Sequence, residues 1–136
     1  MSTYISKDLR RLVEMRAGKC CEYCKMPSNV TFLPHEIDHA IAEKHGGLTE
    51  SENLAYACWR CNRYKGSDLG SFDPQTREFS FLYHPRRQVW SDHFYMIEWK
   101  ILGLTPEGRT TVELLQFNRP DRIAERQRYW FISMTE

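Results

Sequence analysis

The sequence predicts a single domain of the α+β class. Three observations predict it: a length of 136 residues, short helix-like and strand-like segments that alternate, and two Cys-x-x-Cys pairs set 33 residues apart. A chain of this length can bury roughly two thirds of the surface that its unfolded form exposes, which is enough for a core. Hydrophobic residues make up 41% of the chain and charged residues 27%, which excludes a disordered chain.

The first half of the chain predicts one helix, an extended stretch, a short strand and a second helix. Ser6 is a typical N-cap for a helix that runs to about Ala17, where Gly18 ends it. Residues 30–38 contain Thr, Phe and Ile, which favour a strand, and residues 54–57 form a shorter strand candidate. The second helix is predicted over 58–65 and ends at a glycine.

The second half predicts two strand segments followed by two helices. Residues 79–83 and 95–102 look like strands. Thr105 before Pro106 is a helix-start signal, and the helix is predicted to run to about residue 117. A last helix is predicted to start at Asn118-Arg-Pro120.

Four of the five cysteines predict a structural zinc site. Cys21 and Cys24 form one pair, and Cys58 and Cys61 form the other. Two such turns supply four thiolates for a tetrahedral ion, and this closed shell leaves no position for a reacting water. Cys20 is the spare cysteine, because only Cys21 has the two-residue spacing to Cys24. An odd cysteine count disfavours a disulfide framework, and no thioredoxin-like βαβ pattern surrounds either pair, which disfavours a redox protein.

The segment between the pairs, together with the second pair's helix, contains residues suited to hydrolytic chemistry. Asp38 and His39 are adjacent at the expected end of a strand, and Asn62 and Lys65 share one face of the predicted helix. A carboxylate and an amide oxygen suit Mg²⁺ or Mn²⁺, and a neutral imidazole nearby can act as a base on water. A lysine on the same face could contact a phosphate, so the set suits metal-assisted phosphodiester hydrolysis.

The role of one further residue stays open. His45 is a candidate substrate contact, although loop histidines are common. Each candidate also has an ordinary structural interpretation: His39 as a packed histidine, Asn53 as a turn residue and Lys65 as a solvated helix residue. Their occurrence in one ordered pattern is what favours the functional interpretation.

These residues together resemble the HNH endonuclease family, in its subgroup with four zinc-binding cysteines. The resemblance covers residues 20–69 and rests on the ordered run Glu36-Ile-Asp-His39, Gly46-Gly47, Asn53-Leu54 and Cys58-x-x-Cys61-Asn62-x-x-Lys65-Gly66. The second half resembles the extension of many bacterial HNH proteins, at His84-Pro-Arg-Arg and at Gly103-Leu-Thr-Pro. The fold class implied is a zinc-stapled ββα-metal core (20–69), with an N-terminal helix (1–19) and a C-terminal strand and helix extension (70–136).

The resemblance implies a role for each matching residue. Asp38 and Asn62 would bind the catalytic divalent ion, His39 would be the general base, and Asn53 would bond across the loop and orient His39. Lys65 would lie near the phosphate. One departure is visible after His39, where family members often have proline three residues later and this chain reads Ala-Ile-Ala, with Ala42 at the proline position; this should soften the loop without removing a reacting group.

The expected substrate and partner is DNA. The net charge is only +1, so a polyanion would be held by local patches and metal ions rather than by a global field. A zinc-stapled DNA-binding module without turnover is the alternative function. The N-terminus has no apolar segment typical of a secretory signal and no stretch is long enough to span a membrane, so we expect a cytoplasmic protein.

Overall fold

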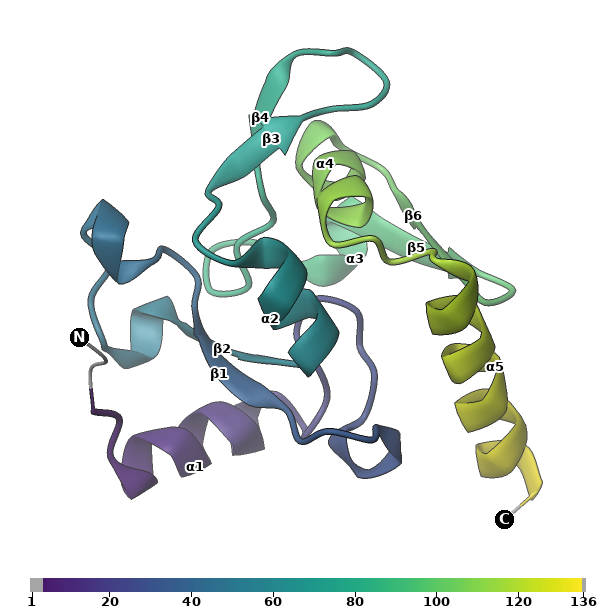
Figure 1. Cartoon of the computed structure of the whole chain (residues 1–136), viewed down its shortest axis with the longest axis horizontal. Helices are drawn as coiled ribbons and strands as arrows, with labels where there is room; N and C mark the ends of the chain where they lie inside the picture. Colours follow the sequence, from purple (N-terminus) through teal and green to yellow (C-terminus); the bar gives the residue numbers. More distant parts are fainter. Residues whose placement is uncertain (1–3, 136) are drawn as a thin grey trace. The chain divides into compact units, whose positions relative to one another are not determined.

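The computed structural model describes residues 4–135, which divide into two compact units. The first, here called the core unit, contains residues up to Leu69 and the short segment His84–Gln88. The second, the extension unit, contains Gly70–Tyr83 and the chain from Val89 onward. Short antiparallel strands and helices make up both units (Figure 1), which confirms the predicted α+β class.

The core unit consists of a two-stranded hairpin and two helices, joined by short 3-10 turns. The predicted strand over 30–38 forms only at its end, because Pro34 lacks the N–H that a strand donates to its neighbour and a 3-10 turn occupies Ser28–Val30. The elements are α1 (Lys7–Arg16), β1 (Glu36–His39), β2 (Leu54–Ala57) and α2 (Trp59–Lys65), with 3-10 turns at Glu43–His45 and Ser51–Asn53.

Helix α1 covers one face of the hairpin. The Ser6 hydroxyl accepts a hydrogen bond from the Leu9 N–H at 3.2 Å and caps the helix, and Gly18, with φ +64°, follows its end. On the helix face, Val13 packs with Leu54 and Tyr56 of β2 in the hydrophobic core of this unit. The cap and the apolar face thus position β2, and through β2 its partner strand.

The strand register determines which residues face α2. Strands β1 and β2 are antiparallel, with Asp38 opposite Ala55 and His39 opposite Leu54. Opposite residues in such a pair lie on the same face, so Asp38 shares the face of Ala55, and His39 shares that of Leu54. All of β2 is buried, and small alanine side chains on the Asp38 face leave room for α2, which packs against β1.

The extension unit contains two hairpins, a short helical turn and two longer helices. The segment 95–102, predicted as strand, folds into a hairpin that turns at Glu98, whose φ is 55°. Thr105 caps α4 by accepting from the Gly108 N–H at 3.0 Å. The elements are β3 (Gly70–Phe72), β4 (Phe79–Phe81), α3 (Trp90–His93), β5 (Phe94–Ile97), β6 (Lys100–Gly103), α4 (Pro106–Leu114) and α5 (Pro120–Thr135). No helix in the described part of the chain is long and apolar enough to cross a membrane.

A bidentate ion pair ties the turn of the β3–β4 hairpin to α4. The two carboxylate oxygens of Asp73 accept from Arg109 at 3.0 and 2.7 Å, and also accept from Gln75 N–H and the Thr76 hydroxyl. The Arg109 guanidinium lowers the pKa of the Asp73 carboxyl well below its ordinary value. The charged form of Asp73 is therefore the form that stabilises the folded unit.

We expect Asp73→Asn to lower the melting temperature at pH 7. Because the folded-state pKa of Asp73 is depressed, its contribution is present above the unfolded pKa of about 3.9 and is lost as the pH falls toward the folded value. The difference in melting temperature between wild type and variant should therefore shrink below about pH 4. Asp92→Asn, at an exposed position, is the matched control, and an equal effect of both changes would contradict this account.

Candidate functional site

The four predicted cysteine ligands lie together in the core unit. The Sγ atoms of Cys21, Cys24, Cys58 and Cys61 all lie within 4.8 Å of one another, and all four residues are buried. The Cys24 and Cys58 sulfurs are 3.7 Å apart, close to the edge of about 3.8 Å that a tetrahedron with Zn–S bonds near 2.3 Å requires. Cys20 is half-buried and outside the cluster, so the choice of Cys21 over Cys20 is confirmed.

Backbone N–H groups point at the cysteine sulfurs, as thiolate ligands need. Cys21 Sγ accepts from the N–H groups of Tyr23 and Cys24, and Cys58 Sγ accepts from Cys61 N–H, each at 3.4 Å. Burial raises the pKa of the Cys21 and Cys61 thiols well above the ordinary value, so a bound cation is what would favour the thiolate form. The donor set fits a closed, structural zinc site.

We expect Cys21→Ser or Cys61→Ser to abolish zinc binding and the cooperative thermal transition, because metal-binding energy is folding energy in small zinc-stapled units. Cys20→Ser should retain both properties. Metal analysis by mass spectrometry and a calorimetric scan on the three variants provide the measurement. Loss of zinc in Cys20→Ser with retention in Cys21→Ser would contradict the ligand set.

Asp38 is buried and bonded from both sides. Its Oδ2 atom accepts from the Tyr23 hydroxyl at 2.8 Å, and the Lys65 ammonium lies 3.2 Å from Oδ2 and 3.4 Å from Oδ1. Burial raises the pKa of the Asp38 carboxyl, while Lys65 and Tyr23 oppose that shift. Since Tyr23 stands between the two cysteines of the first pair, the cysteine cluster and the Asp38 carboxylate are connected by one side chain.

The structure places Lys65 differently from the predicted phosphate contact. The side chain is only 2% exposed and donates to the Asp38 carboxylate and, at 3.0 Å, to the His39 backbone carbonyl. A buried ammonium is stable only when it is paired in this way. Lys65 therefore neutralises Asp38 and attaches α2 to β1, and its charge does not face the solvent.

His39 lies at the end of β1 and is oriented by the loop that follows. Its Nε2 atom lies 2.8 Å from the Thr49 hydroxyl and 3.4 Å from a Glu43 carboxylate oxygen. A partner at one ring nitrogen selects the tautomer and holds the ring plane. The imidazole is therefore held by side chains of the 40–49 loop.

Asn62 lies on α2 and forms a hydrogen bond to a residue of β1. Its Nδ2 group donates to the Glu36 carboxylate at 2.8 Å, so its Oδ1 atom is the group left for another partner. A shallow pocket of about 290 Å³ is lined by Asp38, His39 and Asn62, together with Glu43 and the start of the segment after α2. Three of the predicted functional residues thus converge on one pocket.

Asn53 clamps the loop between the two strands. Its Oδ1 accepts from the Ile41 N–H, and its Nδ2 donates to the Ile41 and Leu48 carbonyls, each at 2.9 Å. Gly47 packs so closely on the Ile41 carbonyl that a Cβ would lie 1.7 Å from its oxygen. Asn53 makes these bonds to the backbone and none to His39 in the described structure, so its influence on His39 passes through the loop.

We expect Asn53→Ala to lower both thermal stability and activity. The change removes three hydrogen bonds from a buried position, and leaves the Ile41 N–H without its acceptor, at a cost of about 1–3 kcal/mol. Thermal melting and cleavage rates, measured on the same zinc-loaded preparation, check the outcome. Ser51→Ala on the same turn is the control. An unchanged melting temperature in Asn53→Ala would contradict the clamp.

His45 lies outside the pocket that contains Asp38 and His39. It is exposed and lines a separate pocket of about 650 Å³ with three arginines, Arg16, Arg86 and Arg87. Arg16 donates to the Ser51 and Leu54 carbonyls at 2.6 Å, and Arg86 pairs with the Glu22 carboxylate. Arg86 of the His84–Gln88 segment therefore helps to hold the core unit together.

Four residues around the pocket were missed by reasoning from the sequence. Tyr23, Glu36, Glu43 and Thr49 bond to Asp38, Asn62 or His39, as described above. Glu36 and Asp38 are two residues apart on the strand, so both lie on one face. This spacing could have indicated that Glu36 lies near the site. Nothing in the local pattern indicates that Thr49 contacts His39, because the two residues are ten positions apart in the chain.

Comparison with known proteins gives one family and one relative. Residues 21–68 match the model of the family described as HNH endonuclease. Over 116 residues the chain is 28% identical to the Septu protein PtuB of Bacillus thuringiensis, an alignment that covers 82% of this chain and 41% of the relative. The chain therefore spans less than half the length of that relative. No solved structure matches the chain.

Proposed function

We propose that the chain, of which residues 21–68 match the model of the HNH endonuclease family, hydrolyses phosphodiester bonds of DNA with the help of a divalent ion. The observation that carries the proposal is the convergence of Asp38, His39 and Asn62 on one pocket. A carboxylate, an imidazole and an amide from a strand end and a helix are the groups that this reaction requires.

The residues of the pocket fit a hard divalent cation such as Mg²⁺ or Mn²⁺. The Asp38 carboxylate has about four lone-pair sites, so its bonds to Tyr23 and Lys65 leave room for a metal. The Asn62 Oδ1 atom is a second oxygen donor of the kind that these ions prefer. The bound ion would supply positive charge for the pentavalent phosphorus and the departing oxygen.

His39 is the proposed general base. In the tautomer that this role requires, Nε2–H would donate to the Thr49 hydroxyl, and the lone pair on Nδ1 would take the proton from water. The Glu43 carboxylate would then stabilise the imidazolium that forms, as a carboxylate does behind other catalytic histidines. Only the neutral imidazole can act as a base on water.

A DNA-binding module without turnover is the alternative, and one observation favours it. The Lys65 ammonium already neutralises the Asp38 carboxylate, as in a purely structural ion pair. The two functions differ in what they require of His39, because a binding module needs no base.

The test is cleavage of a supercoiled plasmid by zinc-loaded protein in Mg²⁺ or Mn²⁺. We expect His39→Ala to lower the rate by about 10² to 10⁴, the contribution of a positioned general base, while DNA affinity and metal affinity stay near wild type. Asn62→Ala should instead raise the Mn²⁺ concentration needed for half-maximal rate. Asn62→Ala is preferable to an Asp38 variant here, because removing Asp38 would leave the Lys65 charge buried and unpaired.

His45→Ala is the matched control, because it removes a histidine of the same unit that does not line the pocket. It should cleave at the wild-type rate. Cleavage by folded, zinc-loaded His39→Ala at the wild-type rate would refute the mechanism, and the absence of cleavage by the wild-type protein under every divalent ion would favour the binding module.

A further inference from the structure

Lys65 is the residue that the sequence predicts to contact a phosphate, but the structure buries it, so another cation would have to make this contact. We propose that the exposed face of α2 provides this contact instead, through a phosphate-binding site made by Arg63 on the ring of Trp59. The inference deepens the proposed function, because its ligand is a backbone phosphate of the same DNA substrate.

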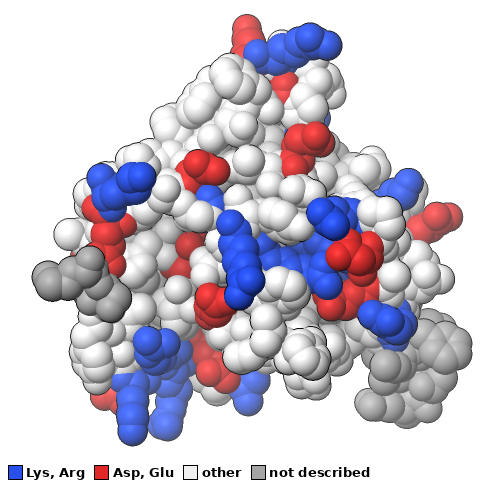
Figure 2. Space-filling view, viewed as in Figure 1, with Lys and Arg blue, Asp and Glu red and all other residues white. Residues whose placement is uncertain are grey.

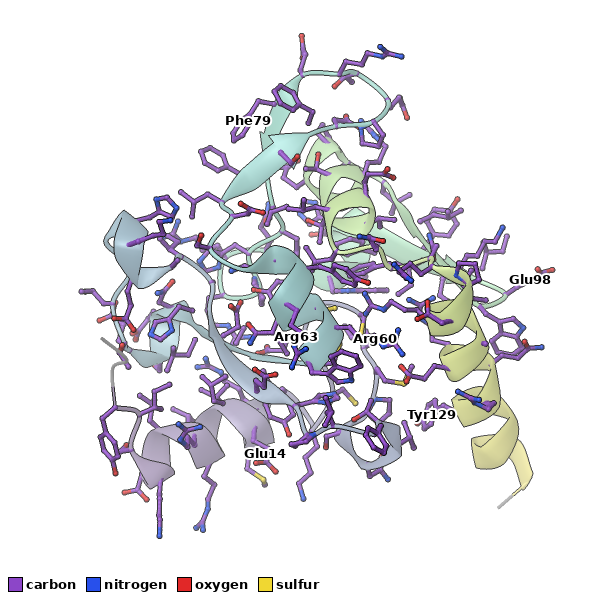
Figure 3. All side chains as sticks on the ribbon, in the orientation of Figure 1. Glu14, Arg60, Arg63, Phe79, Glu98 and Tyr129 are labelled. Carbon is purple, nitrogen blue, oxygen red and sulfur yellow. The ribbon has the colours of Figure 1, made fainter. Side chains whose placement is uncertain are left out.

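Helix geometry places Arg63 at the rim of the pocket. Residues three, four and seven apart share one face of a helix, so Trp59, Asn62, Arg63 and Gly66 lie along one stripe of α2. Asn62 and Gly66 line the pocket, and Arg63 is exposed. Figure 3 shows Arg63 extending from α2 on the side turned to the viewer, and Figure 2 shows Lys and Arg side chains over this helix with Asp and Glu side chains beside them.

Trp59 holds the guanidinium in position. The central carbon of the Arg63 guanidinium lies 5.2 Å from the centre of the Trp59 ring, and that of Arg60 lies 5.0 Å from it. Stacking on an indole uses the face of a guanidinium and leaves its N–H edge available. That edge can donate two parallel hydrogen bonds to a phosphate.

Arg63 has no carboxylate partner among the described residues, whereas Lys65 of the same helix is paired with Asp38. The Glu36 carboxylate, which meets the stripe from β1, accepts from Asn62. A stacked, exposed and unneutralised guanidinium beside the pocket is the arrangement that a phosphate anion would complete.

The test measures binding rather than cleavage. In the His39→Ala background, the affinity for a fluorescein-labelled DNA duplex is measured by anisotropy over a series of KCl concentrations. Arg63→Ala should weaken binding about tenfold, because a charge-assisted contact is lost, and should lower the slope of log K against log[KCl] by about 0.9. Arg63→Lys should keep the slope but bind more weakly than the parent, since the charge remains and the stacked fork is lost.

Arg11→Ala is the matched control, because Arg11 is an exposed arginine of the same unit on α1 that lines neither pocket. It should bind as the parent does. Equal affinity and equal salt slope in Arg63→Ala and Arg11→Ala would overturn the site, as would a parent that binds no DNA. Because affinity is read without turnover, a failure of cleavage alone would refute the proposed function and leave the Arg63 result standing.

Discussion

The four-cysteine cluster is the constraint on which the rest of the core unit depends. Two strands of four residues each cannot form a stable hairpin in water without further support. The cluster joins the turn before β1 to the start of α2, across 33 intervening residues. Cys58 belongs to the cluster and is also the N-cap of α2, because its sulfur accepts a hydrogen bond from the Cys61 N–H. The helix that carries Asn62 is thus positioned by the same sulfur atoms that would hold zinc.

The cluster also extends to the candidate active site through buried polar contacts. Tyr23 reaches from the first cysteine pair to Asp38, and Lys65 reaches to the same carboxylate from α2. A buried carboxylate with two such partners has little freedom to rotate. On the other side of the hairpin end, Asn53 holds the backbone of the loop that supplies Thr49 and Glu43 to His39. The pocket is therefore formed by a rigid strand end and helix on one side and a clamped loop on the other.

Much of the core unit follows from local signals in the sequence. The Ser6 cap, the β2 segment, the α2 helix and the selection of Cys21 over Cys20 each depend on a few neighbouring residues or on metal-ligand spacing. The position of Lys65 could not be derived in this way, because a lysine on a helix face is exposed or buried according to what packs against it. The same holds for Arg86, whose partner Glu22 lies 64 residues away, and for the hairpin turn at Glu98, where a non-glycine residue adopts a positive φ. The strand predicted over 30–38 is shortened by Pro34, whose effect depends on where pairing with β2 begins.

The central claim is that two metal sites of different chemistry lie in one small unit, one of sulfur and one of oxygen. Anomalous diffraction from crystals of the zinc-loaded protein soaked in Mn²⁺, recorded at the absorption edges of both metals, tests it most directly. The account predicts a zinc peak among the four cysteine sulfurs and a separate manganese peak between Asp38 and Asn62. Manganese bound elsewhere, with the Asp38–Lys65 pair intact and the pocket empty, would contradict it.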